Sequence, residues 1–194
     1  PAGVGGLIKD AGPHNWGFYT EPQKHMNKRQ LWWPRGKGWG GSSSINGMIY
    51  IRGHARDYDQ WRQSGLTGWG YADVLPYFCR SEGYRGEADM HHGSDGPLVV
   101  EDSPLDSIAY DSFIKSGQQA GFPYTPDFNG AEQEGVGPYQ RTINDGERWS
   151  TARAYLHPVL KERPNLTVMS TALVSRIRFE GKRAIGVETL AKPG

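Results

Sequence analysis

The sequence predicts a mixed α/β fold, of either the α/β or the α+β kind, with long loops between its elements. Short helical patterns alternate with short strand patterns along the 194 residues. Glycine and proline, 27 and 13 residues, make up about a fifth of the chain, against roughly 12% in average usage, and therefore predict many turns. The 7 Trp, 10 Tyr and 6 Phe argue against disorder, because disordered segments are poor in aromatic residues.

The first half of the chain begins without regular structure. The first 35 residues carry apolar patches without sustained periodicity, and we expect extended or looping chain there. The next element is a helix in which Val74, Leu75 and Phe78 share one face. Pro76 should restrict this helix to a short piece or lie in its first turn. Residues 91–97 have the composition of a turn, and residues 98–100 form a short strand candidate.

A longer helix is predicted to start with Ser103 at the N-cap and Pro104 at the first helical position. Gly121 is well placed to end it, and the stretch 122–137 is typical of a loop. The residues expected to lie on its inner face recur at spacings of four, four and three: Ala109, Phe113, Gly117 and Ala120.

The last part of the chain predicts one helix and then strands. The helix should begin near Ser150 and turn Ala154, Tyr155 and Val159 inward, although Pro158 disfavours it. Alternating apolar and charged residues follow, which is typical of half-buried strands. We expect three strands, with the turn between the last two at residues 180–182: 166–170, 173–179 and 184–190.

Charge and composition exclude several classes of protein. Lys and Arg number 22 against 21 Asp and Glu, and this balance argues against a nucleic-acid partner. No run of about 18 apolar residues predicts a membrane span. The single Cys79 excludes an internal disulfide framework. The chain begins at Pro1 without a secretory signal, so we expect a piece of a longer protein in the cytoplasm, with association to a membrane left open.

Residues 34–53 form the most unusual stretch, and they contain Gly36, Gly38 and Gly41 at the G-x-G-x-x-G spacing, with Asp57 further on. We reject a dinucleotide fingerprint, because that motif needs a buried strand directly before it and the preceding residues are short, charged and broken by proline. A P-loop is excluded as well, because no Ser or Thr follows a Lys at the required spacing.

The same stretch can bind a ligand in a narrower way. Gly40 and Gly41 allow the backbone to approach a flat ligand closely. Ser42, Ser43 and Asn46 add hydroxyl and amide groups beside backbone N–H donors, which suits a pyrophosphate or a polar ring edge. A Ser-capped turn at a helix start remains the alternative.

The run from Pro34 to Gly53, Pro-Arg-Gly-Lys-Gly-Trp-Gly-Gly-Ser-Ser-Ser-Ile-Asn-Gly-Met-Ile-Tyr-Ile-Arg-Gly, closely resembles the first signature of the glucose–methanol–choline (GMC) oxidoreductases. These are FAD-dependent alcohol oxidases and dehydrogenases, and the likeness is greatest to their choline dehydrogenase and bacterial alcohol dehydrogenase branch. Further stretches resemble the family in the same order along the chain: 57–61, 69–71, 75–78, 92–98, 148–156 and 163–168.

The resemblance implies an FAD site. Ile45 stands where covalently flavinylated members carry His, so the FAD should be non-covalent. Gly38 and Trp39 depart from the family pattern and leave local contacts near the flavin open. The residues implied to bind FAD are Gly38, Gly40, Gly41, Ser42, Asn46, Gly47, Met48 and Ile49 in the signature and Val174 beyond it.

The resemblance also implies what the chain lacks. The amino-terminal dinucleotide motif should precede this segment, and the catalytic His that takes the hydroxyl proton should follow it, so no catalytic residue is expected here. The substrate is then a small-molecule alcohol, while the electron acceptor and a homo-oligomeric state are left open. Three segments are implied: 1–64 in the FAD domain with the signature loop, 65–150 in the substrate-binding cap, and 151–194 returning into the FAD domain.

Two alternatives stay open: a flavin-dependent lyase or decarboxylase of the same fold, and a non-catalytic carbohydrate-binding or interaction module built from Trp-rich loops. We expect no metal at His91 and His92, because no further ligand lies at a suitable spacing. Cys79 should be a packed or half-exposed thiol, and Ser150 should be a helix N-cap rather than a nucleophile.

Overall fold

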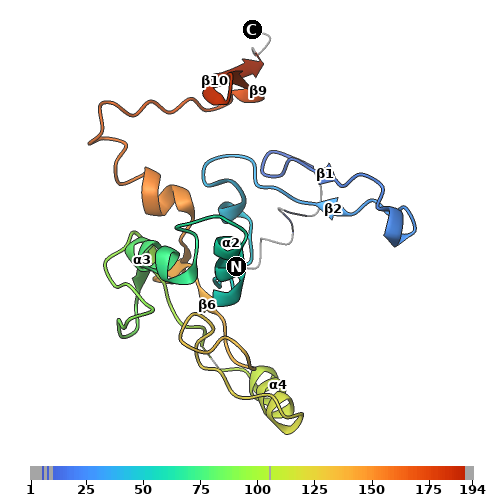
Figure 1. Cartoon of the computed structure of the whole chain (residues 1–194), viewed down its shortest axis with the longest axis vertical. Helices are drawn as coiled ribbons and strands as arrows, with labels where there is room; N and C mark the ends of the chain where they lie inside the picture. Colours follow the sequence, from blue (N-terminus) through green and yellow to red (C-terminus); the bar gives the residue numbers. More distant parts are fainter. Residues whose placement is uncertain (1–5, 7, 9–10, 105, 191–194) are drawn as a thin grey trace. The chain divides into compact units, whose positions relative to one another are not determined.

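The computed structural model describes residue 6, residue 8, residues 11–104 and residues 106–190, and these divide into two compact units within Pro1–Pro158 and Val159–Gly194 (Figure 1). The two units are described separately. Within the described residues, no helix has the length and apolar character needed to cross a bilayer.

The first unit opens with an antiparallel pair of two-residue strands. β1 (Phe18–Tyr19) pairs with β2 (Trp32–Trp33), and the 3₁₀ helix η1 (Lys24–Met26) lies between them. The buried Asn15 fastens this ribbon, because its Oδ1 accepts the backbone N–H of Gly17 at 3.2 Å and that of Arg35 at 3.0 Å. The expectation of mainly extended chain is met here.

Two helices follow, and in each an aspartate of the first turn accepts the backbone N–H of the N-cap residue. α2 (Ala55–Gln63) was not predicted, and Asp57 accepts the N–H of the N-cap residue His54 at 3.0 Å. In α3 (Tyr71–Ser81) Asp73 does the same for Gly70, also at 3.0 Å. These caps satisfy backbone donors that a helix start leaves free.

The helix α3 confirms the predicted face and corrects the role of Pro76. Val74, Leu75 and Phe78 are all half-buried. Pro76 neither shortens the helix nor lies in its first turn, since it is the sixth of 11 residues. The ring removes one hydrogen bond, to the carbonyl of Ala72. Because Ala72 and Pro76 are both exposed, water can satisfy that carbonyl.

The strand β4 (Glu82–Tyr84) lies parallel to β5 (Leu98–Val100), which is the strand predicted there. The helix α4 (Ile108–Gln119) begins later than expected, with Ser107 at the N-cap. Ser103 is unavailable for capping because its hydroxyl donates to the carbonyl of Tyr139. Gly121 follows the helix with a φ of 92° and ends it as predicted.

Short antiparallel pairs and short helices complete this unit. The loop before β3 (Ile49–Tyr50) contains the 3₁₀ helix η2 (Gly41–Ser44). The remaining elements of the unit are β6 (Gln140–Arg141), which pairs with β3, β7 (Ile143–Asn144), which pairs with β8 (Glu147–Arg148), and the π-helical turn η3 (Ala152–Leu156). The apolar core of the first unit is small. Among the described residues it consists of Ile45, Met48, Val99, Val100, Ile143, Ala152 and Ala154.

The helix predicted near Ser150 is only the turn η3. Ala154 is buried as expected, but Tyr155 is 42% exposed, and Val159 belongs to the other unit. The N–H of His157 bonds to the carbonyl of Ala152 across a widened turn. Pro158 comes next, lacks an N–H and clashes with a preceding turn, so the helix does not continue.

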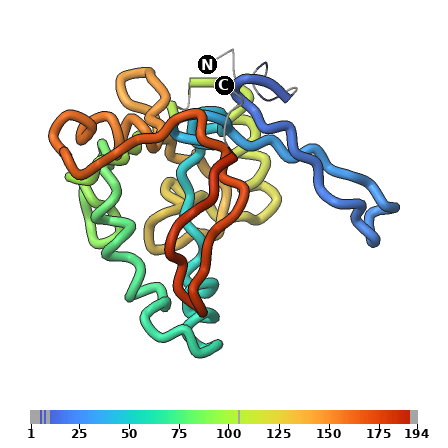
Figure 2. Tube along the Cα trace, turned by 90° about the horizontal axis from the view of Figure 1, so that it is seen from above, coloured from blue at the N-terminus to red at the C-terminus, as the bar shows by residue number. Residues whose placement is uncertain are grey.

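The second unit is built on one hairpin, β9 (Leu173–Glu180) with β10 (Arg183–Leu190), drawn in red in Figure 2. The two strands and their turn are as predicted, with Gly181 at a φ of 58°. The strand expected at Leu166–Ser170 does not form. A strand needs a neighbour to accept and donate its backbone hydrogen bonds, and no described residue pairs with this segment.

Candidate functional site

The glycine-rich loop, residues 36–49, has a backbone that most residue types would not adopt. Gly38, Gly40 and Gly41 have φ values of 119°, 83° and 52°. The loop contains a 3₁₀ helix of four residues. A dinucleotide-binding motif would open a long α-helix at this point, so the geometry agrees with our rejection of that motif. The N–H groups of Gly38, Gly40 and Gly47 donate to no acceptor among the residues that the structure describes. Such free donors, two of them at the left-handed Gly38 and Gly40, suit an anionic or polar ligand.

The glycines of this loop fall into two groups. A Cβ built on Gly38, Gly41 or Gly47 would meet nothing within 4 Å. A Cβ on Gly40 would lie 2.6 Å from Ser44 Oγ and 3.3 Å from Ser150 Cβ. Gly40 is therefore needed for the packing of the loop itself. The other three leave an open face of bare backbone, which a flat molecule can approach.

The side-chain oxygens of Ser42, Ser43 and Asn46 all bond within the loop itself. Ser42 Oγ accepts the N–H of Gly36 at 3.1 Å, and Ser43 Oγ donates to the carbonyl of Gly40 at 2.5 Å. Asn46 Oδ1 accepts the N–H of Met48 at 3.0 Å. These side-chain oxygens stabilise the loop, because short polar side chains readily bond to nearby backbone. The backbone N–H groups of Gly38, Gly40 and Gly47 remain as donors without an acceptor among the described residues.

The remaining predicted residues differ in exposure. Ile45 and Met48 are buried, at 7% and 6% exposed, whereas Ile49 is 53% exposed. Met48 holds a left-handed φ of 63°. The structure thus brings together all the predicted FAD-binding residues from Gly38 to Ile49 on one loop. Val174 lies in β9 of the second unit, where it pairs with Thr189.

A cavity of about 530 Å³ adjoins the end of this loop. Gly47 and Ile49 line one part of it, and the rings of Tyr110, Phe113 and Tyr139 contribute aromatic surface. The other residues that line it are Ser103, Pro104, Asp106, Ile114, Gly137, Pro138 and Arg141. A pocket with apolar walls and few polar groups is typical of a small-molecule site.

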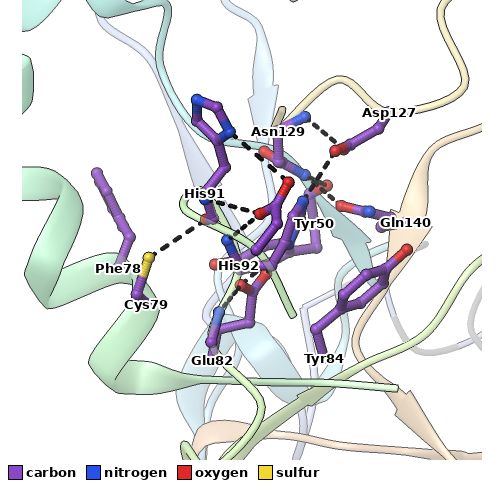
Figure 3. Close-up of polar contacts among 12 residues, drawn as sticks. Tyr50, Phe78, Cys79, Glu82, Tyr84, His91, His92, Asp127, Asn129 and Gln140 are labelled. Atoms are coloured by element: carbon purple, nitrogen blue, oxygen red, sulfur yellow. Dashed lines mark hydrogen bonds and ion pairs between the residues drawn. The ribbon is translucent and has the colours of Figure 1, made fainter. Parts of the chain in front are cut away.

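A second polar region is a buried ionic cluster of Arg52, Glu82, His92 and Asp127, the last three of which are labelled in Figure 3. Arg52 Nη2 is 2.8 Å from Glu82 Oε2. His92 lies between two carboxylates, with Nδ1 3.1 Å from Glu82 Oε2 and Nε2 2.8 Å from Asp127 Oδ2. Asn129 joins the cluster to β3, because its Oδ1 accepts the N–H of Arg52 at 2.8 Å and its Nδ2 donates to the carbonyl of Tyr50 at 3.1 Å.

The cluster is charged at neutral pH. Burial alone would lower the pKa of His92, but its hydrogen bonds to Asp127 and Glu82 raise that pKa to about 9. Burial acts to raise the pKa of Asp127, and the hydrogen bond from His92 outweighs it, so the pKa is lowered. Burial, together with Glu82, raises the pKa of Tyr50 to about 12, which keeps its hydroxyl protonated. The cluster therefore pairs two cations with two anions.

Comparison with known proteins decides the family. The family model described as GMC oxidoreductase matches residues 5–194. The chain belongs to the GMC oxidoreductase family. It is 51% identical over 175 residues to mitochondrial choline dehydrogenase of Mus musculus, covering 90% of this chain and 29% of the relative. It is 53% identical over 175 residues to oxygen-dependent choline dehydrogenase of Brucella anthropi, covering 90% and 32%.

Solved structures agree with this GMC assignment. Pyridoxine 4-oxidase from Mesorbium loti superposes with a TM-score of 0.89 at 33% identity, over 100% of this chain and 38% of that one. An FAD-dependent oxidoreductase from Chaetomium thermophilum gives 0.80 at 28%, over 93% and 34%. The chain thus spans about a third of its relatives' length. The predicted family, the mixed α/β fold class and the cofactor FAD are confirmed.

Sequence reasoning missed the buried ionic cluster of this GMC chain. His92 was considered only as a metal ligand, whereas it bonds to two carboxylates, and the described residues contain no group of three or more His, Cys, Asp or Glu suited to a metal ion. The four residues of the ionic cluster are widely separated along the chain and follow no regular spacing. Glu82, for example, is the first residue of β4, and its neighbours in sequence give no sign of a buried partner.

Two further residues were considered as nucleophiles, Cys79 and Ser150, and for these we predicted a packed or half-exposed thiol and a helix N-cap. Cys79 is half-buried, its thiol lies 3.3 Å from the carbonyl of His91, and burial raises its pKa, which disfavours a nucleophilic thiolate. Ser150 is buried, and its Oγ accepts the N–H of Arg153 at 3.4 Å. The N-cap residue of η3 is Thr151, so Ser150 lies one position before the cap that we predicted for it.

Proposed function

We propose that this chain is part of an FAD-dependent oxidoreductase that acts on the CH–OH group of a small alcohol. The observation that supports this most directly is the open backbone face at Gly38, Gly41 and Gly47, next to a cavity of about 530 Å³, in a chain of the GMC family. FAD, when bound, would accept hydride from the carbinol carbon. The residues of this chain would bind and orient the cofactor and enclose the alcohol.

The glycine-rich loop is proposed to hold FAD without a covalent bond. Ile45 carries an apolar, buried side chain, which has no atom able to bond to a flavin. The free N–H groups of Gly38, Gly40 and Gly47 supply donors for polar cofactor atoms. The proposed binding residues are Gly38, Gly40, Gly41, Ser42, Asn46, Gly47, Met48 and Ile49, with Val174 in the second unit.

The cavity is proposed to bind the alcohol and exclude water from it. Choline, the alcohol in the names of the two curated relatives, is the first candidate. The aromatic rings of Tyr110, Phe113 and Tyr139, with the carboxylate of Asp106 at the same cavity, suit a substrate that carries a positive charge. No residue of this chain is proposed as the catalytic base, which we expect beyond residue 194.

The finer assignments are proposals as well. We propose that residues 1–64 and 151–194 belong to the FAD domain and residues 65–150 to the cap. We propose a cytoplasmic location, with or without peripheral association to a membrane, which cell fractionation tests. We also propose assembly into a homo-oligomer, which light scattering of the full-length protein tests. The electron acceptor is determined by assaying oxygen uptake against artificial acceptors.

The decisive experiment uses the purified full-length protein. We expect flavin absorption bands, release of free FAD on denaturation, and reduction of an artificial electron acceptor with choline or another primary alcohol. A colourless full-length protein would overturn the proposal, and sugar binding without flavin would favour an interaction module instead. Cleavage of the substrate without net reduction of an acceptor would indicate a lyase or decarboxylase.

A further inference from the structure

The segment 148–151, which begins with the last residue of β8, contacts the glycine-rich loop through both of its end residues. Arg148 Nη1 donates to the carbonyl of Ser43 at 3.1 Å and to Asn46 Oδ1 at 2.7 Å. The N–H of Thr151 donates to Ser43 Oγ at 3.0 Å, and Thr151 Oγ1 donates to the carbonyl of Gly40 at 3.3 Å. Two residues three positions apart thus bind the loop from Gly40 to Asn46.

Arg148 is also connected to Met48, because both donate a hydrogen bond to Asn46. Asn46 Oδ1, which accepts from Arg148, also accepts the N–H of Met48 at 3.0 Å. Met48 has a φ of 63°, a left-handed conformation that costs an L-residue about 1–2 kcal/mol. The same oxygen therefore links the guanidinium to the strained residue that directly follows Gly47 and precedes Ile49.

The charge of Arg148 lacks a counter-ion in the described part of the chain. No carboxylate there lies within ion-pair distance of it, and its Nη2 is buried without a hydrogen-bond partner among the same residues. Burial lowers the pKa of Arg148. Arg148 as a whole is half-buried, and its charge is offset only by neutral oxygens, so an ion pair does not explain its place beside the loop.

We propose that Arg148 is a positioning residue for the cofactor: it fixes Asn46, and through Asn46 the conformation of residues 46–48, in the shape that binds FAD. Thr151 holds the other end of the same loop. This inference rests on the proposed function, because the loop must be an FAD site for its shape to matter. It concerns residues outside the signature itself, 95 or more positions further along the chain.

The test measures FAD affinity of the full-length protein, by titrating the apoprotein with FAD and following flavin fluorescence. Arg148→Met should raise the Kd for FAD about tenfold or more, since a hydrogen bond from a charged group is lost. Arg148→Lys keeps a donor and should regain part of the affinity. Arg153→Met is the matched control, because Arg153 contacts Glu147 and the ring of Trp149 but not the loop, and its Kd should stay within about twofold of wild type.

A double-mutant cycle separates positioning from a general loss of stability. Asn46→Ala removes the exposed acceptor that Arg148 uses, so it should raise the Kd alone, and its effect should not add to that of Arg148→Met. Strictly additive effects, or an unchanged Kd and flavin spectrum in both single variants, would overturn the inference. If Arg148→Met does not fold, Arg148→Lys takes its place in the cycle and is judged by the same criterion. A wild-type protein that binds no FAD would instead refute the proposed function.

Discussion

The glycine-rich loop and the buried ionic cluster are stabilised in different ways. Within the loop the hydrogen bonds are neutral, with Ser42 and Asn46 accepting and Ser43 donating, and much of the loop is exposed. The cluster uses full charges, with the side chains of Arg52, Glu82 and His92 at 3% exposed or less. The loop leaves backbone N–H groups without acceptors among the described residues, whereas the cluster places each charged side chain beside one of opposite charge.

This difference separates binding from stability. An open loop with free N–H groups gains a favourable interaction only when a ligand arrives. A buried ion pair is costly to break, because the remaining partner keeps its charge without compensation. Changes in the loop should therefore alter FAD affinity more than folding, and changes in the cluster should do the reverse. The predictions below test this contrast.

The largest effect is expected for Glu82→Gln. Glu82 accepts from Arg52 Nη2 at 2.8 Å, from His92 Nδ1 and from the N–H of Gly93 at 3.0 Å. Its replacement leaves Arg52 and His92 with too little negative charge, so the free energy of unfolding should fall by about 3–5 kcal/mol. Urea denaturation of the full-length protein measures this change.

The exposed ion pair of the hairpin provides the control for Glu82→Gln. Glu188 Oε1 lies 2.6 Å from Arg178 Nη1, with side chains that are 39% and 58% exposed. Glu188→Gln should lower the free energy of unfolding by no more than about 1 kcal/mol. Equal losses in the two variants would contradict the distinction between the cluster and the rest of the molecule.

The second prediction concerns pH. The pKa of His92 rises from 6.5 to about 9 on folding, so its contribution is fully present below pH 6.5 and is lost as the pH rises through 9. The pKa of Asp127 is lowered on folding, so its contribution is present above its unfolded value of 3.8 and is lost in acid. The cluster should be most stabilising between these limits.

The His92→Gln variant isolates the alkaline part of this dependence. The difference in the free energy of unfolding between wild type and variant should shrink by on the order of 3 kcal/mol between pH 6 and pH 10. Denaturation curves at several pH values measure it. A difference that stays constant over this range would show that folding does not raise the pKa of His92.

The same contrast explains how much the sequence could predict. The glycine-rich loop was predictable because its residues are contiguous and its glycines permit few backbone alternatives. The hairpin β9–β10 was predictable from the alternation of Ile177 and Phe179 with charged residues and from the turn at Gly181. Both signals lie within one short stretch of chain.

The features that the sequence did not predict depend on contacts between distant residues. Glu82 and Asp127 meet only through His92, and nothing local marks them as partners. The start of α4 moved because Ser103 bonds to Tyr139, which lies 36 positions further along the chain. Leu166–Ser170 has strand composition, but no described strand lies beside it to complete the ladder. Tertiary contacts decided all of these.

The third prediction tests the loop's own packing with Gly40→Ala. The new methyl group would lie 2.6 Å from Ser44 Oγ, at a φ of 83°. Strain and crowding should lower the free energy of unfolding of the apoprotein by about 1–3 kcal/mol. Thermal denaturation of the FAD-free protein measures it. An apoprotein as stable as wild type would show that the loop is not fixed before the cofactor binds.

The smallest effect on folding is expected for Gly47→Ala, which completes the comparison. A Cβ at Gly47 meets nothing within 4 Å, its φ lies outside the left-handed range, and the residue lines the cavity. The apoprotein should unfold within about 0.5 kcal/mol of wild type. The Kd for FAD should nevertheless rise, because the methyl group occupies the face that a flat ligand approaches. Since Gly40→Ala perturbs the loop from within and Gly47→Ala only from its open side, an unchanged Kd in the latter would place the cofactor elsewhere and remove the basis for regarding this loop as a binding surface.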